Sequence, residues 1–223
     1  MLKLHTLCRR LGIYGVVLTS GLCSALLLSR VAYTDTMLFM MLGWNLLLAW
    51  IPFVLSVTMV VVSRLPAARW LLLPILGAAW LVFLPNAPYL ITDLIHLENR
   101  PPVPYWYDIA MLGLFGCTGL LLGVRSLEHV HDLIRQSTGE VAGWLSTGAI
   151  ALLCGLGMYL GRFDRWNSWD LISQPGAIVA DVLRRAAAPS ENLQAWGFTL
   201  TFGAAMLAFY IAMRQEKPAQ PSC

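Results

Sequence analysis

The sequence predicts an all-α protein, a polytopic transmembrane bundle of about six spans with short amphipathic re-entrant or interfacial helices on the outer face. Of its 223 residues, 58% are hydrophobic and only 12% are charged, about half the roughly 25% of charged residues in a soluble domain. Apolar stretches close to the roughly 20 residues that cross a bilayer recur six times. We therefore expect one integral-membrane domain over residues 1–213.

The six predicted spans differ in how clearly they are bounded. They cover residues 11–29, 37–62, 69–84, 108–126, 141–160 and 195–213. The apolar run of the first span exceeds the 7–15 residues of a signal-peptide core, and Arg30 follows it before any small-residue cleavage site. We expect it to be a retained helix. The third span is short and ends at Pro85.

Charge and cysteine content exclude several classes of protein. The net charge of +3 comes from scattered basic residues, so we expect no nucleic-acid partner. The five cysteines show no C-x-x-C spacing, and we predict neither a disulfide framework nor a zinc site. We expect no cofactor and assign no metal-binding residue, although one interpretation of the candidate site below involves a divalent metal. The polar tail 214–223, with two prolines, should be disordered and cytoplasmic.

The distribution of Lys and Arg predicts the orientation in an inner, plasma membrane. With the N-terminus inside, nine of these residues lie on the cytoplasmic side: Lys3, Arg9, Arg10, Arg64, Arg69, Arg125, Arg135, Arg214 and Lys217. Six lie on the other side: Arg30, Arg100, Arg162, Arg165, Arg184 and Arg185. We therefore predict cytoplasmic N- and C-termini. The connections after the third and fifth spans then share the extracytoplasmic face.

Two features within the spans predict helix contacts. Glycines recur one turn apart in the fourth and fifth spans, at Gly113, Gly116, Gly119, Gly123, Gly157 and Gly161, which lets helix backbones approach closely. Asn45 lies in the apolar second span. We expect it to hydrogen-bond a neighbouring helix, with lining of a path as the alternative.

The stretch FLPNAPYLITDLIHLENRPP, residues 83–102, interrupts the apolar sequence. Asn86 is a favoured N-cap, and a helix from Ala87 to Glu98 would span about 18 Å, too short for a bilayer. Its polar positions at helical spacing are Tyr89, Thr92, Asp93 and His96, and its apolar positions are Leu90, Ile91, Leu94 and Ile95. The polar stripe must face protein, water or headgroups, because lipid would leave Asp93 and His96 unsatisfied.

Two further polar clusters belong to the same predicted face. GRFDRWNSWD, residues 161–170, follows the fifth span, and PYWYD, residues 104–108, leads into the fourth. Tryptophans at headgroup depth and arginines that extend to the interface are typical of a membrane surface. The following PGAIVADVLRRAAA predicts an amphipathic surface helix whose Ile178, Val179, Val182 and Leu183 face the membrane or the bundle.

These clusters supply the candidate site residues. Asp93, His96, Arg162 and Arg165 are the catalytic candidates, and the binding candidates are Asn86, Tyr89, Asp108, Trp166, Asn167, Trp169 and Asp170. Three interpretations stay open. In the first, Asp93 and His96 are two ligands of a divalent metal. In the second, one of these side chains is a general base and the arginines bind an anion beside it. In the third, the charged side chains form a structural network of ion pairs.

The run EHVHD, residues 128–132, superficially suggests metal ligands. His129 and His131 are two residues apart and so point apart on a helix. We expect a solvated helix end at the cytoplasmic side. H-E-x-x-H, G-x-S-x-G, P-loop and Rossmann motifs do not occur in the sequence.

The phrases FLPNAPYLITDLIHL, WYD and GRFDRWNSWD resemble those of a family of bacterial polytopic membrane proteins, domain of unknown function 1361. The resemblance implies a bacterial inner-membrane protein and assigns no activity. The positions that match its motifs are Asn86, Pro88, Tyr89, Asp93, Asp108, Arg162, Arg165, Trp166, Asn167, Ser168, Trp169 and Asp170.

Three kinds of function fit these observations. The first is a membrane-embedded enzyme or binding protein for a lipid or cell-envelope precursor headgroup, because arginines beside tryptophan suit phosphate. The second is a small transporter or channel, weakened by the lack of a mid-span carboxylate. The third is a non-catalytic accessory subunit that docks a partner protein.

Overall fold

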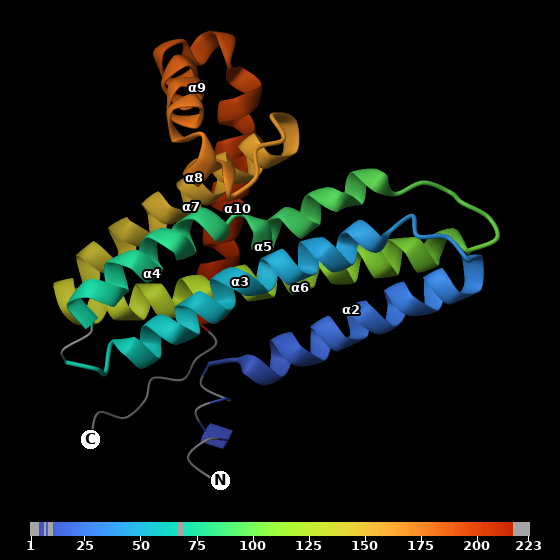
Figure 1. The fold of residues 1–223 in the computed structure, drawn as a ribbon, viewed down its shortest axis with the longest axis horizontal. Helices are drawn as coiled ribbons and strands as arrows, with labels where there is room; N and C mark the ends of the chain where they lie inside the picture. The colour runs from blue at the N-terminus through green and yellow to red at the C-terminus, as the bar shows by residue number, and fades with distance from the viewer. Residues whose placement is uncertain (1–4, 7, 9–10, 67–68, 216–223) are drawn as a thin grey trace. The chain divides into compact units, whose positions relative to one another are not determined.

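The computed structural model describes residues 5–6, 8, 11–66 and 69–215, and every regular element in these residues is a helix (Figure 1). The helices are α2 Ile13–Thr34, α3 Met40–Val62, α4 Arg69–Phe83, α5 Asn86–Tyr89, the 3-10 helix η1 Leu90–His96, α6 Tyr105–Thr138, α7 Glu140–Phe163, α8 Asp170–Ser173, α9 Pro175–Ala187, the 3-10 helix η2 Pro189–Glu191 and α10 Leu193–Gln215. The tail that we expected to be disordered lies outside these residues from 216 on.

Six helical stretches are long and apolar enough to cross a membrane, which confirms the predicted fold class. They are Ile13–Thr34, Met40–Val62, Arg69–His96, Tyr105–Thr138, Glu140–Phe163 and Leu193–Arg214. The chain is therefore a multi-pass membrane protein. Which membrane holds it, and with which orientation, stay predictions.

The third span differs from its expected form, because α4, α5 and η1 follow one another over 28 residues instead of ending at Pro85. Pro85 has helical dihedral angles, φ −59° and ψ −25°, and its carbonyl accepts the Tyr89 N–H at 3.1 Å. The expected N-cap at Asn86 is wrong: Asn86 lies inside α5 and its amide donates to the Phe83 carbonyl at 2.9 Å.

The chain divides into two compact units, Met1–His129 and Val130–Cys223. The boundary falls within α6. We describe each unit by itself.

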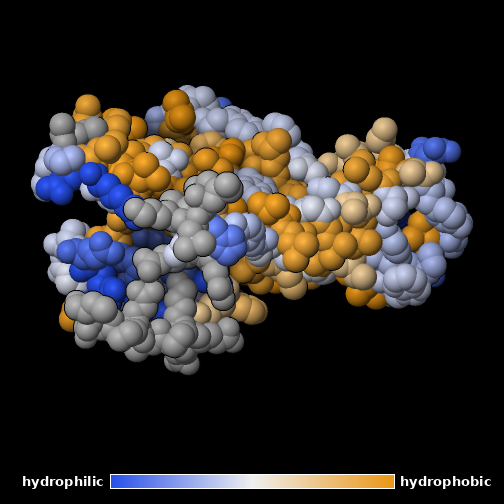
Figure 2. Space-filling model, turned by 90° about the horizontal axis from the view of Figure 1, so that it is seen from below, coloured by the Kyte–Doolittle hydropathy of each residue, from blue (hydrophilic) through white to orange (hydrophobic). Residues whose placement is uncertain are grey.

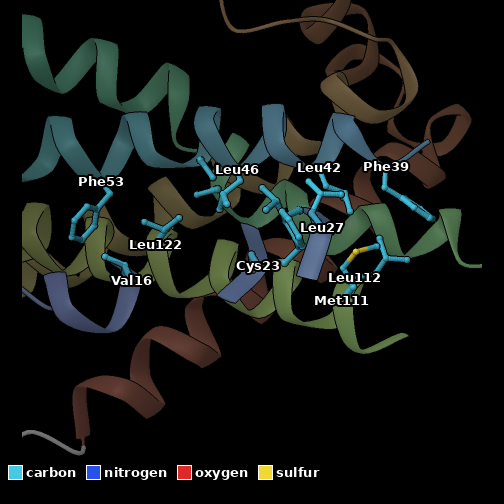
Figure 3. Packing of buried hydrophobic residues seen from close by; sticks show 14 residues of the cluster. Val16, Cys23, Leu27, Phe39, Leu42, Leu46, Phe53, Met111, Leu112 and Leu122 are labelled. Atoms are coloured by element: carbon cyan, nitrogen blue, oxygen red, sulfur yellow. The ribbon is translucent and has the colours of Figure 1, made fainter. Parts of the chain in front are cut away.

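The first unit is built around the buried stripe of α3. Leu42, Leu46, Ala49 and Phe53 recur every three or four residues and are almost fully buried, as expected for one face of a helix. Figure 3 shows this stripe packed against residues of α2 and α6, among them Val16, Cys23, Leu27, Met111, Leu112 and Leu122.

Close backbone approach fixes α5 and η1 against α6. A Cβ atom on Gly119 would collide with the backbone carbonyl oxygen of Ala87, and one on Gly116 would lie 3.3 Å from the Ile91 Cα. The predicted packing role is therefore confirmed for Gly116 and Gly119, and it is wrong for Gly113, whose Cβ position has no atom within 4 Å. Because the contact on Gly119 is with backbone, no side-chain rotation relieves it.

The second unit is organised by the pair α7 and α10. Gly155 of α7 abuts the Thr199 carbonyl of α10, and a Cβ on Gly203 would lie 3.0 Å from the Ala151 carbonyl oxygen. A small cluster of Tyr159, Leu160, Ile178 and Ala195 joins the end of α7 and the beginning of α10 to α9.

Large apolar side chains cover much of the outer surface of the spans. Leu18 is 75% exposed and Trp70 is 77% exposed. Figure 2 shows large areas of hydrophobic side chains on the visible face, interspersed with paler and hydrophilic ones. A soluble protein rarely exposes so much contiguous apolar surface, which a bilayer would cover.

Candidate functional site

The Asn86–His96 segment turns its polar side chains into the first unit. Asp93 is 1% exposed, and its Oδ2 accepts a hydrogen bond at 2.9 Å from the Asn45 amide of α3. The Thr92 hydroxyl donates to the Tyr89 carbonyl at 2.7 Å, whereas Ile95 points outward. The polar stripe was expected to face protein, water or headgroups, and Asp93 faces protein. The predicted hydrogen bond from Asn45 to a neighbouring helix is confirmed.

Asp108, a predicted binding residue, forms a buried ion pair with Arg30. The Arg30 Nε and Nη2 donate to the two carboxylate oxygens of Asp108 at 2.6 and 2.9 Å, and the guanidinium lies 4.4 Å from the centre of the Phe39 ring. This bidentate geometry engages both oxygens and joins α2 to α6.

Arg30 was not among the predicted site residues, because the predicted first span ends at residue 29. In the structure α2 runs on to Thr34, which places Arg30 inside a helix rather than in a connection. The sequence contains no spacing that pairs it with Asp108, 78 residues later.

Helix direction brings these groups to one end of the first unit. The short connections 35–39 and 97–104 join α2 to α3 and η1 to α6, so Arg30, Asn45, Asp93 and Asp108 all lie near the same helix ends. The half-buried Arg100 is also there, with its Nη2 2.7 Å from Glu98 Oε2 and its guanidinium 5.7 Å from the Phe39 ring centre.

The metal interpretation of Asp93 and His96 gains no support. Within the part of the chain that the structure describes, no group of three or more His, Cys, Asp or Glu side chains is placed to hold a metal ion. The catalytic roles of Asp93 and half-buried His96 stay predictions.

The second candidate segment, residues 161–170, begins with a sharp reversal at the end of α7. The Leu160 carbonyl accepts both the Asp164 N–H at 3.2 Å and the Trp166 N–H at 3.1 Å. Arg165, between these donors, has φ +59°, a left-handed conformation that non-glycine residues rarely adopt. The turn therefore holds Arg165 in a strained and defined position.

Asn167 and Asp170, both predicted binding residues, hold the rest of this turn. Asp170 Oδ2 accepts hydrogen bonds from the Asn167 backbone N–H at 2.7 Å and from its side-chain amide at 3.2 Å. This pattern is a local turn-stabilising arrangement. The hydrogen bonds between Asn167 and Asp170 therefore explain the presence of both residues as stabilisers of the turn.

A half-buried ion pair joins the same turn to α9. Arg185 Nη1 lies 2.9 Å from Asp164 Oδ2 and 2.7 Å from Asp181 Oδ2, and the guanidinium lies 5.3 Å from the Tyr159 ring centre. Burial opposes the charge of Arg185, but Asp164 and Asp181 outweigh it and hold the pKa of Arg185 above its ordinary value. The pairing of Arg185 with Asp164 was not predicted, because Asp164 lies 21 residues away and outside α9.

The remaining candidates of this segment are positioned at the surface. Arg165 and Trp169 are exposed, and Arg162 and Trp166 are half-buried. Among the described residues no ion pair involves Arg165. Asp93 belongs to the first compact unit and Arg162 and Arg165 to the second, and their placement on one face of the membrane stays a prediction.

The expectation of a solvated helix end at EHVHD is wrong. His129 and His131 are 7% and 1% exposed, because α6 continues to Thr138 and keeps both inside the protein. The His129 Nδ1 lies 2.9 Å from the Ser56 hydroxyl, and the His131 Nδ1 lies 2.7 Å from the Thr147 hydroxyl. Their predicted divergence is confirmed, since these partners are on different helices.

Comparison with known proteins assigns the chain to a family. The family model described as Protein of unknown function (DUF1361) matches residues 44–209, well over half of the chain. The chain belongs to this family. No curated protein matches it, and no solved structure does. The DUF1361 match contains both candidate segments, and it confirms the resemblance that their sequence phrases indicated.

Proposed function

We propose that this DUF1361 protein binds the phosphate-bearing headgroup of a lipid or cell-envelope precursor at the extracytoplasmic surface of the inner membrane. Residues 161–170 make the contact, and residues 86–108 form the second part of the site. The observation that carries the proposal is the exposed guanidinium of Arg165 on a strained turn.

The conformation of Arg165 is energetically unfavourable for its residue type. A left-handed backbone costs an L-residue with a Cβ about 1–2 kcal/mol, and glycine would adopt it without that cost. Strained positions of this kind are found preferentially at functional sites. A cation held at this position therefore supports a binding role over a purely structural one.

The chemistry around Arg165 suits a phosphate group. A guanidinium matches phosphate oxygens in a bidentate geometry, and Trp169 is an aromatic side chain of the type that lies at headgroup depth. The hydrogen bonds donated to the Leu160 carbonyl and to Asp170 Oδ2 already fix the turn. A preorganised turn loses little conformational entropy when a ligand binds.

Chemical processing of the headgroup is a further part of this proposal. It assigns Asp93 or His96 as a base and Arg162 as a second cation, and it requires the two segments to meet. Formation of a short bifunctional thiol cross-link between Glu98→Cys and Ser168→Cys in membranes tests this requirement. Absence of the cross-link, with both thiols reactive, would remove the catalytic part.

The transporter alternative gains little from the polar residues inside the spans. Asn45 donates to Asp93, Thr118 lies 3.3 Å from the Cys23 sulfur, and Ser56 lies 2.9 Å from the His129 ring. Each of these side chains serves a contact between helices. The accessory-subunit alternative predicts binding of a protein instead of a headgroup.

The decisive variant is Arg165→Gly, because it removes the guanidinium and relieves the backbone strain together. The assay is titration of the full-length protein in nanodiscs with dioctanoyl phosphatidic acid, with inorganic phosphate as competitor. We expect thermal stability to be unchanged or higher and affinity to fall about 10- to 100-fold, as for loss of a hydrogen bond to a charged group.

The matched control is Arg64→Ala, which removes an exposed arginine at the connection between α3 and α4. It should leave phosphatidic acid affinity unchanged. Competition by inorganic phosphate at equal concentration would identify a free anion as the ligand. Equal affinity of wild type and Arg165→Gly for phosphatidic acid would refute the proposed site.

A further inference from the structure

The exposed surface of α9 is unusual for a helix outside the spans. Its thirteen residues, Pro175–Ala187, extend about 20 Å and cannot cross a bilayer. The exposed residues after Pro175 are Gly176, Ala177, Val179, Ala180, Leu183, Arg184, Ala186 and Ala187. Arg184 is the single charged residue among them. We call this set the outer face of α9.

The opposite side of α9 is fixed to the second unit. Ile178 and Val182 pack in the cluster of Tyr159 and Ala195, which belong to the end of α7 and the beginning of α10. The sequence-based expectation placed Ile178, Val179, Val182 and Leu183 towards the membrane or the bundle. The structure divides them, with Ile178 and Val182 inward and Val179 and Leu183 exposed.

Polar contacts fix the depth of α9 relative to the span ends. Arg185 pairs with Asp164, the residue directly after α7, and the Trp196 indole N–H donates to the Arg185 carbonyl from the first turns of α10 at 3.3 Å. Figure 1 shows α9 beside the beginning of α10. Because two spans end or begin there, α9 lies at the level of a membrane surface.

The charges exposed at this level include the cations of Arg184 and Arg165 and the carboxylate of Glu191 in η2. Asp164 and Asp181 both pair with Arg185, and Arg184 Nη2 lies 3.7 Å from Asp181 Oδ1 while the Arg184 side chain is 76% exposed. Arg184 therefore presents a cation beside an apolar helix face. This combination of an apolar face with an adjacent cation fits anionic lipid.

We infer that the outer face of α9, together with Ile172 of α8, is embedded in the headgroup–acyl boundary of the protein's own membrane, with Arg184 contacting anionic headgroups. Ile172 is 82% exposed and Leu183 is 62% exposed, and lipid would cover both. The contact is with bulk lipid. It is independent of the ligand proposed at Arg165.

Site-directed spin labelling of the full-length protein tests this inference. Cys8, Cys117 and Cys223 are replaced by Ser, and nitroxide labels are attached at Val179→Cys and Leu183→Cys in nanodiscs of equimolar phosphatidylcholine and phosphatidylglycerol. Both labels should collide more often with oxygen than with a water-soluble nickel chelate. Leu18→Cys on the lipid-facing surface of α2 supplies the lipid reference, and buried Ile178→Cys supplies the protein-interior reference.

Two results would overturn the inference. Preferential collision with the nickel chelate would place the outer face in water. Protection from both reagents, as at Ile178→Cys, would show that a protein or a second copy of the chain covers it.

The contact of Arg184 with anionic headgroups is tested separately by the depth of the spin label. The label at Val179→Cys should lie deeper in phosphatidylglycerol-containing discs than in pure phosphatidylcholine. This difference should vanish with Arg184→Ala and persist with Arg184→Lys; persistence in Arg184→Ala would refute the role of Arg184. Arg165→Gly should leave label depth unchanged, so the headgroup site and the α9 contact can fail separately.

Discussion

Replacing Asp108 by Asn should strongly destabilise the first unit. The side chains of Arg30 and Asp108 are 3% and 2% exposed, and two hydrogen bonds of 2.6 and 2.9 Å join them. Asp108→Asn leaves the guanidinium buried without its counter-charge. Loss of one partner from such a pair costs about 3–5 kcal/mol, because the remaining charge is uncompensated.

The control is the double variant Arg30→Met and Asp108→Leu, which removes both charges and approximately keeps their volume. Replacement of a whole buried pair by apolar residues is often neutral or stabilising. The free energy of unfolding is measured by denaturant titration in mixed micelles with tryptophan fluorescence as the signal. The interpretation of this pair as structural fails if Asp108→Asn lies within about 0.5 kcal/mol of wild type.

Two further predictions concern helix contacts of the first unit. Gly119→Ala should lower the free energy of unfolding by about 1–3 kcal/mol through overpacking. The control Gly113→Ala, with no atom within 4 Å of its Cβ position, should be neutral or slightly stabilising. Equal effects of the two substitutions would refute the close approach of the helices. Asn45→Ala should cost about 1–3 kcal/mol by removing an amide donor from buried Asp93. Thr19→Ala, which removes an intrahelical bond, is its control, and a loss no larger than in this control would contradict the role of Asn45.

Hydropathy predicted the six spans because each span needs its own long apolar run. Such a run can be recognised in the sequence without knowing which helices it contacts. The boundary after Phe83 was harder to predict. Pro85 removes one backbone donor but its helical φ and ψ let the chain continue into α5, so a proline that is expected to end a helix here only alters its hydrogen bonding. The short polar helix thus became the end of the third span.

The partners of the polar residues were not predictable in the same way. The position of Asn45 in an apolar span predicted a contact between helices, but the sequence did not identify Asp93 as its partner. Nor did the sequence identify Asp108 as the partner of Arg30. His129 and His131 lie in a charged run that is typical of a solvated helix end. In the structure α6 continues beyond them, and both side chains are buried. Such pairings depend on which helix faces meet in three dimensions, and short spacing patterns record only contacts within one helix.

The separation of Arg30 from Asp108 has a consequence for biosynthesis. The first span carries its arginine into the membrane before the 78 residues up to Asp108 have been made, which takes roughly 4–16 s at about 5–20 residues per second. During that interval the guanidinium has no carboxylate, and an arginine near a helix end extends to the interface instead. Newly inserted α2 should therefore sit shallower than in the finished protein and be drawn inward only when the fourth span arrives.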